Sequence, residues 1–459
     1  MTNLSGANLN SDAAVGSQGE GWDSPSIFPA YSAYKNSGME WLGEVPVHWA
    51  LGSLKHLAWI RNGRDYKDVE SPGGEYPVIG SGGQFANAIQ YLYDGESVLL
   101  GRKGTIDKPL YIHGRFWTVD TMFYTEVSSG ASAKFLYYNA LTIPFEYYST
   151  STALPSMTQG DLLNHPCAIP TFKEQIQIAR FLDHETARID ALIEEQQRLI
   201  ELLKEKRQSV ISHTVTKGLN STVPMKDSGV EWLGEVPAHW DVKALRYLGE
   251  CQNGINIGGE AFGSGSPFVS YGDVYKNDVL PAEVTGLVQS SPEDQQRYSI
   301  EYGDVFFTRT SETVDEIGFS ATCFQELPNA VFAGFLIRFR PIGKSLTPGF
   351  SKYYFRNQGL RIFFNKEMNL VTRASLSQDL LKLLPVTLPP VVEQIKISDF
   401  LDRVTVEFAS LLKQGIKAID LLKERRSALI SAAVTGKIDV RGWQPPTPAT
   451  SPELAPEAV

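Results

Sequence analysis

Two basic loops of matching composition contain the residues of this chain best suited to contact a nucleic acid. Residues 100–105 (LGRKGT) follow an apolar run, and residues 307–311 (FTRTS) end a second apolar run, which is preceded by a Gly-Asp pair. An arginine can hydrogen-bond guanine with two donors, whereas serine and threonine hydroxyls bind phosphates or base edges. Because both loops place arginine directly after a strand-like run, we interpret them as DNA contacts. The alternative is that both are ordinary solvated turns.

Other basic side chains of the same regions are suited to phosphate groups, although an ordinary charged surface would have the same composition. The residues predicted to contact DNA are Arg61, Arg64, Arg102, Lys103 and Thr105 in the first half of the chain, and Arg309, Thr310, Ser311 and Arg373 in the second.

No catalytic or metal-binding constellation accompanies these residues. Residues 343–345 (GKS) resemble the end of a phosphate-binding loop, but Arg338 stands where the leading glycine is required. His48 and His239 have no nucleophile or metal ligand near them in the sequence. We therefore predict no catalytic residue, no metal site and no cofactor bound by the chain itself.

Composition narrows the class of protein. The net charge of −10 is unfavourable for a chain that binds phosphates alone, unless a local basic face or a positively charged partner compensates. No apolar run reaches the roughly 18 residues of a membrane span, and the N-terminus does not resemble a signal peptide. Three widely spaced cysteines fit a reducing compartment. We expect a cytoplasmic protein without membrane segments.

Several segments occur twice. Residues 37–49 (SGMEWLGEVPVHW) and 228–240 (SGVEWLGEVPAHW), here called the opening segments, are identical at eleven of thirteen positions and lie 191 residues apart. Residues 156–159 (SMTQ) match residues 375–378 (SLSQ) at an offset of 219, so the region between the two matches is 28 residues longer in the second copy. This pattern predicts a fixed frame that carries two different inserts.

Each opening segment contains two tryptophans with the same spacing, Trp41 and Trp49 in the first and Trp232 and Trp240 in the second. Tryptophan can stack on nucleic-acid bases. Because these residues lie in the shared segments rather than in the inserts, we predict that they serve packing instead.

Two long stretches, beginning near Glu174 and Glu393, have the seven-residue apolar spacing of a coiled coil. Each predicts a helix of about 40 residues, roughly 60 Å long. Gln196 and Gly415 interrupt the pattern; in an antiparallel pair they would face each other, or they are a tolerated polar site and a kink. The predicted seam residues are Leu182, Ile189, Leu192, Gln196, Leu199, Leu203, Val210, Leu401, Val404, Phe408, Leu411, Gly415, Leu422 and Leu429.

The sequence thus predicts an α/β (α+β) architecture with an internal pseudo-two-fold repeat, in which two β-rich modules are each followed by a long helix and the helices form an antiparallel coiled coil. The predicted divisions are a flexible leader (1–34), a first module (35–170), a first helix (171–218), a linker (219–227), a second module (228–389), a second helix (390–438) and a disordered tail (439–459).

The order of these motifs resembles the specificity subunit of Type I restriction-modification systems. The resemblance rests on the opening segments, on the Glu-Gln-Ile and Phe-Leu-Asp motifs of both helices, and on the helix-ending runs 211–219 and 430–438. It spans roughly residues 35 to 443 and includes every motif twice.

This resemblance implies that each module is a target recognition domain that reads one half of a bipartite, asymmetric site in double-stranded DNA. The helices would set the gap between the halves and bind two methyltransferase subunits, and endonuclease-translocase subunits would complete the enzyme. S-adenosylmethionine, ATP and Mg²⁺ would be used by those partners, and this chain would catalyse nothing.

A second hypothesis remains open on the residues alone. A duplicated coiled-coil scaffold or adaptor that binds protein partners would need the same repeat and the same heptads. The acidic net charge favours this alternative, whereas the ordered motifs favour the specificity subunit.

Overall fold

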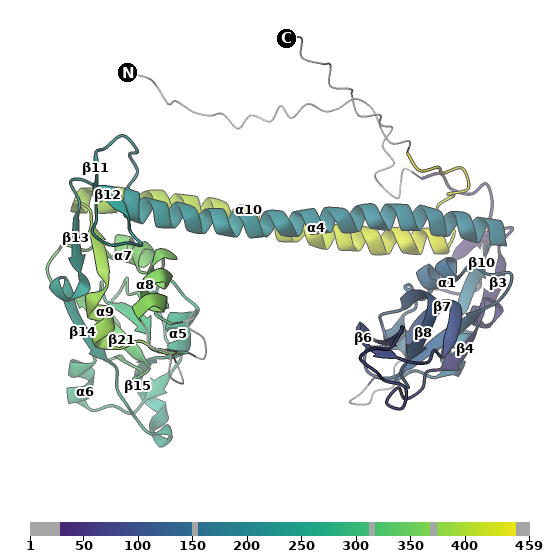
Figure 1. The fold of residues 1–459 in the computed structure, drawn as a ribbon, viewed down its shortest axis with the longest axis horizontal. Helices are drawn as coiled ribbons and strands as arrows, with labels where there is room; N and C mark the ends of the chain where they lie inside the picture. Colours follow the sequence, from purple (N-terminus) through teal and green to yellow (C-terminus); the bar gives the residue numbers. More distant parts are fainter. Residues whose placement is uncertain (1–27, 149–154, 312–316, 368–373, 447–459) are drawn as a thin grey trace, which may run out of the picture. The chain divides into compact units, whose positions relative to one another are not determined.

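The computed structural model describes residues 28–148, 155–311, 317–367 and 374–446, which form two compact units (Figure 1). Unit 1 contains the described parts of residues 1–196 and 418–459, and unit 2 contains those of residues 197–417. Each unit therefore combines one β-rich module with part of both long helices. The predicted architecture of two β-rich modules, each followed by a long helix, is confirmed.

The module of unit 1 is built on a six-stranded sheet in the order β4-β9-β7-β8-β5-β6, antiparallel except between β5 and β8. The end of β7 is buried on both faces: Val98 and Leu100 pack with the residues of α1, and Leu99 packs in the opposite cluster. Two-sided burial explains its unbroken apolar run. The elements are β1 (Tyr34–Asn36), β2 (Glu44–Pro46), β3 (Ala50–Ser53), β4 (Ala58–Asn62), β5 (Tyr76–Gly80), β6 (Gly83–Ala88), β7 (Tyr93–Gly101), β8 (Leu110–Thr118), β9 (Met122–Val127), α1 (Ala133–Ala140), α2 (Phe145–Tyr148), α3 (Gln159–Asn164) and β10 (Pro166–Ile169).

The module of unit 2 has a four-stranded sheet, β14-β21-β17-β19, and a separate three-stranded sheet, β16-β15-β20. Val305 and Phe307 of β17 face one core cluster and Phe306 faces the other, as in β7. The elements are β11 (Met225–Asp227), β12 (Glu235–Pro237), β13 (Asp241–Ala244), β14 (Gly249–Asn253), β15 (Phe262–Val269), α5 (Tyr271–Tyr275), β16 (Leu287–Val288), α6 (Pro292–Arg297), β17 (Val305–Thr308), β18 (Thr310–Ser311), β19 (Ser320–Thr322), β20 (Val331–Phe332), β21 (Leu336–Pro341), α7 (Pro348–Tyr354), α8 (Gly359–Glu367), β22 (Ala374–Ser375), α9 (Gln378–Leu383) and β23 (Pro385–Leu388).

The long helices are α4 (Phe172–Lys217) and α10 (Val391–Val434). In unit 1 the first part of α4 packs against the last part of α10 in one core cluster, and Asp190 binds Arg426 at 2.9 Å. In unit 2 the end of α4 packs against the first part of α10. The helices thus run antiparallel within each unit. No helix in the described part of the chain has the length and hydropathy needed to cross a membrane.

The histidine–tryptophan pair of each opening segment binds the first turn of a long helix. Trp49 Nε1 donates to Glu174 Oε1 (3.1 Å), and His48 Nε2 lies 3.0 Å from Glu174 Oε2. In unit 2, Glu393 makes the same pair of contacts with the His-Trp of its own opening segment, at 2.9 and 3.0 Å. Trp49 and Trp240 are completely buried, which confirms the predicted packing role for these two. Trp232 is only partly buried, and Trp41 is 45% exposed, with one face stacked on His165.

The glutamine next to each of these glutamates ties a module to its helix. Gln175 accepts a hydrogen bond from the backbone N–H of Ser132, the N-cap of α1 (2.9 Å). Gln394 accepts one from the N–H of Thr347, the N-cap of α7 (2.9 Å). The repeated Glu-Gln-Ile motif therefore fixes both the opening segment and the module relative to the helix.

The predicted coiled-coil seam is wrong at three residues of one row. Leu192, Leu199 and Leu411 are 49%, 45% and 46% exposed, whereas their neighbours Ile193 and Ile200 are partly or fully buried. Steps of three and of four residues both fit a heptad, and only the packed surface decides between them. The other predicted seam residues are buried or partly buried. Gln196 and Gly415 belong to different units, so their pairing stays a prediction.

The predicted leader and tail extended too far into the chain. Phe28 and Tyr31 are only 8% and 5% exposed, and Val440 is 1% exposed. Trp443 packs against Phe181 of α4, with ring centroids 5.3 Å apart. The prediction of a flexible leader is wrong for residues 28–34, and that of a disordered tail is wrong for residues 439–443, because aromatic and apolar side chains of both segments pack against α4.

Candidate nucleic-acid interface

The two predicted arginines occupy the same place in their modules. Arg102 follows β7: its N–H donates to Thr121 O (2.9 Å), and its carbonyl accepts from the N–H of Met157 (3.0 Å). Arg309 follows β17: its N–H donates to Phe335 O (3.0 Å), and its carbonyl accepts from the N–H of Leu376 (2.7 Å). Equivalent backbone bonds thus hold each arginine between its strand and the repeated Ser-x-Ser/Thr-Gln segment.

In unit 1 the Arg102 side chain is partly exposed. Its Nη1 donates to Asp120 O at 3.3 Å, and its guanidinium lies 5.9 Å from the centre of the Phe123 ring. The neighbouring Lys103 and Thr105 are exposed. A cavity of about 490 Å³ opens beside them, and its lining residues are Asn62, Arg102, Lys103, Phe123, Ser156, Met157, Thr158, Gln159 and Gly160.

In unit 2 the side chain of Arg309 is likewise partly exposed, but one of its nitrogens is enclosed. The Nε of Arg309 is buried and has no hydrogen-bond partner among the described residues. Thr310 pairs with Ser375 between β18 and β22. The backbone of Ser311 belongs to β18, whereas Arg373 lies outside the described residues. The predicted DNA contacts of unit 2 that can be placed therefore gather beside the Ser-x-Ser/Thr-Gln segment, as in unit 1.

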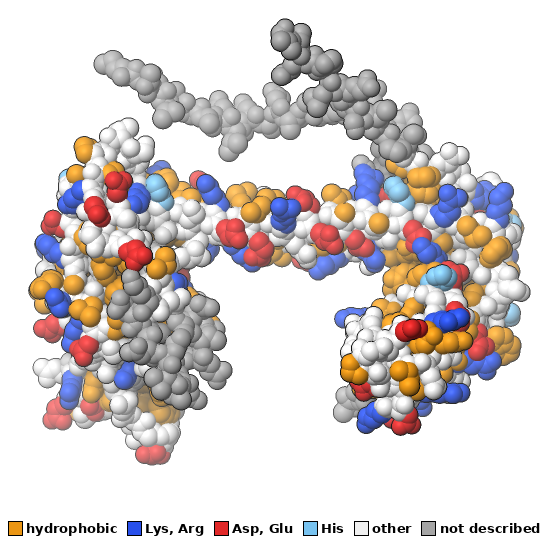
Figure 2. Space-filling view, in the orientation of Figure 1, with side chains coloured by type: hydrophobic (Ala, Val, Ile, Leu, Met, Phe, Trp, Pro, Cys, Tyr) orange, Lys and Arg blue, Asp and Glu red, His pale blue; other side chains and the backbone are white. Residues whose placement is uncertain are grey.

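Arg61 and Arg64 lie at and just beyond the end of β4. Arg61 is paired with Glu126 across the sheet at 3.0 Å, and this hydrogen bond raises the pKa of its guanidinium. Both arginines are exposed, and Arg64 makes no ion pair within the described ranges. On the face drawn in Figure 2, acidic and basic side chains are interspersed over both modules. Arg64 is thus the freer of the two to neutralise a phosphate.

Two polar side chains in each module were not predicted. Asn62 and Gln159 line the cavity beside Arg102. In unit 2, the Gln378 amide, oriented to satisfy its neighbours, accepts from the backbone N–H of Asn253 at 3.2 Å. Both residues recur at the offsets of the repeat, 191 for the asparagine and 219 for the glutamine. That recurrence was the available signal; paired amides are suited to hydrogen bonds with base edges.

None of the three cysteines is poised for nucleophilic chemistry. All are free thiols, and Cys167 and Cys323 are fully buried. Burial raises the pKa of Cys167 to about 12 and the pKa values of Cys251 and Cys323 to about 11. These thiols are protonated at neutral pH, and the thiolate is the reactive form.

Comparison with known proteins places the fold and the repeat in a family. The specificity subunit of the Type I restriction enzyme EcoKI from Escherichia coli (strain K12) is 25% identical over 296 residues, which is 63% of this chain and 60% of that protein. The match to each curated relative spans less than two thirds of that relative's length.

Two solved structures share the fold. A chain from a structure on complex assembly and conformational transition of the type I R-M system has a TM-score of 0.60 at 16% identity, covering 85% of this chain and 98% of that one. The HsdS subunit from Thermoanaerobacter tengcongensis has a TM-score of 0.51 at 15% identity, covering 86% and 98%.

The profile of the Type I restriction modification DNA specificity domain matches twice, at residues 46–203 and 237–420. Each match takes in nearly all of one module and part of the helix that follows it, so the matched ranges coincide with the two halves of the repeat. The chain therefore belongs to the family of Type I restriction-modification DNA specificity subunits.

Proposed function

We propose that this chain selects the DNA sequence for a Type I restriction-modification enzyme, with each module reading one half of a bipartite, asymmetric site. The observation that carries this proposal is the equivalent placement of Arg102 and Arg309 in two otherwise different modules. One frame that holds two unlike surfaces is suited to two unlike half-sites. Two bidentate arginine contacts, one per module, would supply direct readout in the major groove.

The complex contains two methyltransferase subunits and, for cleavage, endonuclease-translocase subunits. Exposed apolar side chains on the long helices support the binding of protein partners, because soluble proteins rarely leave such groups uncovered in number. In unit 2 they include Leu199, Leu202, Val406, Leu411 and Ile416, which are between 45% and 70% exposed.

Partner subunits also reconcile DNA binding with a net charge of −10, because their basic surfaces contribute phosphate contacts. In this proposal the chain performs no reaction itself, and S-adenosylmethionine, ATP and Mg²⁺ are used by the partners. The complex works in the cytoplasm, where the three free thiols stay reduced.

Genome-wide methylation mapping, with and without this gene, tests the function. We expect loss of one split methylation motif that has a fixed spacer. An unchanged methylome, with the partner methyltransferase expressed, would overturn the proposal and leave a protein-binding scaffold as the better account. Removal of two heptads from α4 should in addition change the spacer or prevent assembly, because the helix sets the separation of the half-sites.

A further inference from the structure

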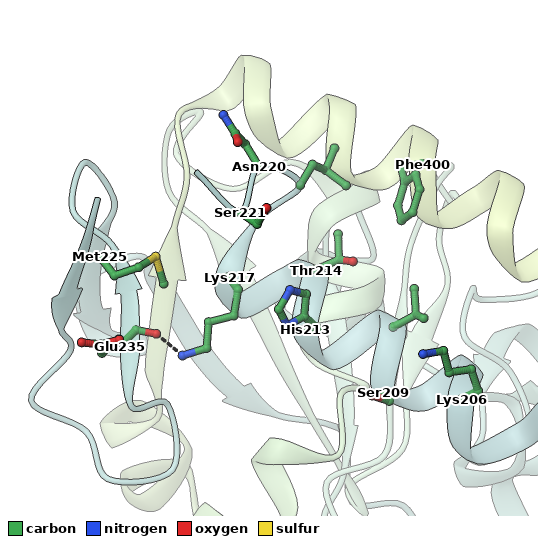
Figure 3. A pocket seen from close by; sticks show the side chains of 13 residues that line it. Lys206, Ser209, His213, Thr214, Lys217, Asn220, Ser221, Met225, Glu235 and Phe400 are labelled. Atoms are coloured by element: carbon green, nitrogen blue, oxygen red, sulfur yellow. Dashed lines mark hydrogen bonds between the residues drawn. The ribbon is translucent and has the colours of Figure 1, made fainter. Parts of the chain in front are cut away.

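A pocket at the end of α4 in unit 2 has a filled counterpart in unit 1. Phe181 and Phe400 stand at the same position of α4 and α10, nine residues after Phe172 and Val391. Phe181 is completely buried, whereas Phe400 is only partly buried and lines a cavity of about 620 Å³ (Figure 3). The same position of the repeat is therefore closed in one unit and open in the other.

In unit 1 two chain ends close the site with aromatic rings. The rings of Phe28 and Trp443 meet Phe181 edge-on, with centroids 5.1 and 5.3 Å away. The side chain of Gln177 donates to the carbonyl of Trp443 at 2.6 Å. The counterpart thus shows what this site accommodates: aromatic rings on segments whose backbone carbonyls are bound by the helix, with Trp443 at the end of a turn in which its N–H donates to Val440 O at 3.1 Å.

In unit 2 one continuous linker takes the place of both chain ends. The repeat places Leu219 opposite Phe28 at an offset of 191 and opposite Ile438 at an offset of 219. Leu219 is 44% exposed, whereas Phe28 and Ile438 are 8% and 3% exposed. Within the described ranges no aromatic ring contacts Phe400. Leu219 therefore leaves unfilled the space that the segments carrying Phe28 and Trp443 fill in unit 1.

The lining of this Phe400 pocket mixes apolar side chains with basic side chains, hydroxyls and an amide. Phe400 and Met225 lie at opposite ends of the pocket, and His213 of α4 lies between them (Figure 3). Lys206 lies at the Phe400 end, and the other lining residues include Val210, Leu219, Ser209, Thr214, Asn220 and Ser221. Glu235 is the one acidic residue of the lining.

The ammonium of Lys217 is already held by the backbone carbonyls of Leu233 and Glu235. Lys396, at the position of Gln177, is exposed one turn before Phe400 and can donate as Gln177 does. The side-chain donors of Lys206, His213 and Lys396 are suited to a carboxylate or to a backbone carbonyl.

We propose that the Phe400 pocket binds an aromatic side chain on a segment of a protein partner, with an acidic residue beside the ring that meets Lys206 and His213. The volume is within the range of ligand pockets and exceeds what one ring needs. The proposal rests on the proposed function only in taking that partner to be a subunit of the same complex. The apolar side chains of Phe400, Val210 and Leu219 in the lining favour an aromatic side chain of a peptide over a DNA backbone, which offers phosphates and no ring of this kind.

A fluorescein-labelled pentapeptide, Ser-Asp-Trp-Asp-Ser, is the direct probe for the full chain. We expect binding in the submillimolar range, at least about tenfold weaker with alanine in place of tryptophan. The methyl resonance of Met225, assigned with Met225→Leu, should shift on binding. Leu219→Glu, at an exposed position, should abolish the shift and the binding, whereas Ile342→Glu, a matched exposed position outside the pocket, should leave both unchanged.

The assembled complex identifies the natural occupant. With methyltransferase bound, the Met225 resonance should move and the peptide should no longer bind. A free chain that ignores the peptide, a peptide insensitive to Leu219→Glu, or a pocket blocked by duplex DNA instead of by the methyltransferase would each overturn the proposal. Methylation mapping of the wild-type and Leu219→Glu strains separates the proposed function from the pocket proposal. If the wild-type strain lacks the split methylation motif, the proposed function is refuted. The peptide assay still tests the pocket in that case.

Discussion

In unit 1 the opening segment and the long helices meet where two chain ends also pack, whereas in unit 2 one linker passes through the equivalent place. The glutamate at the start of the helix differs accordingly. Glu174 is 5% exposed and binds Tyr31, His48 and Trp49, but Glu393 is 26% exposed and, among the side chains that the structure describes, binds only the histidine and the tryptophan. A continuous linker in unit 2 and two packed segments in unit 1 can therefore occupy the same place in the repeat. The linker leaves the glutamate of the helix more exposed.

The two modules share one part of their sheets and differ in the rest. The strands β4, β9 and β7 in unit 1 correspond to β14, β21 and β17 in unit 2, with the same pairing. Beyond them, unit 1 continues its sheet through β8, β5 and β6, whereas unit 2 adds β19 and a separate sheet. The repeated side-chain contacts involve the helices or the opening segments. The inserts can therefore change without disturbing the frame.

The largest effect is expected at the two glutamates. Glu174→Ala would leave buried donors of Tyr31 and Trp49 without an acceptor, which should lower the free energy of unfolding of unit 1 by about 3–5 kcal/mol. Glu393→Ala should cost unit 2 about 1–3 kcal/mol, because it has fewer and more exposed partners. Hydrogen exchange resolved by unit measures both. Glu174→Gln, which keeps an acceptor, is the control; equal losses in the two units would contradict the comparison.

The next largest difference between the two units is expected in how their stability depends on pH. His165, which is 1% exposed, has Leu384 as its counterpart at an offset of 219. Burial lowers the pKa of His165 from 6.5 to about 4. Between these values the unfolded chain binds a proton that the folded chain does not.

The free energy of unfolding of unit 1 should consequently fall by up to about 3 kcal/mol as the pH drops from 6.5 to 4, with no such contribution above 6.5. His165→Leu should remove this pH dependence in hydrogen-exchange measurements on unit 1. An unaltered pH profile in the variant would assign the acid sensitivity to other groups.

The two arginines should affect different half-sites. Arg102→Ala and Arg309→Ala should each weaken binding of the assembled complex by about 1–3 kcal/mol, and each should relax the sequence requirement at one half only. Binding to duplexes with one half-site scrambled measures this. Arg64→Ala is the matched control: as a phosphate contact it should reduce the salt dependence without changing sequence preference. If one arginine variant relaxed both halves, the division of labour between modules would be wrong.

The sequence predicted the features that repeat. The offsets located both helices, and matching loops after matching strands predicted that Arg102 and Arg309 are equivalent, as their backbone bonds confirm. The features that were missed depend on contacts between distant segments. Gln177 binds the carbonyl of Trp443, 266 residues away, and nothing local to either residue indicates that contact. The cavity beside Arg102 likewise joins Asn62 to Gln159 across the module.

The smallest change in the free energy of unfolding is expected for a predicted seam residue that is exposed in the structure. Leu192 was predicted to pack but is 49% exposed, whereas Ile189, one turn earlier on the same helix, is 4% exposed. Leu192→Ala should change the free energy of unfolding of unit 1 by no more than about 0.5 kcal/mol, because little apolar surface is lost from the core. Ile189→Ala should cost about 2–5 kcal/mol. Chemical denaturation of the free chain compares the pair. A comparable loss from both variants would restore Leu192 to the seam, and a loss from Leu192→Ala seen only in the methyltransferase complex would instead assign this leucine to the surface that the partner covers.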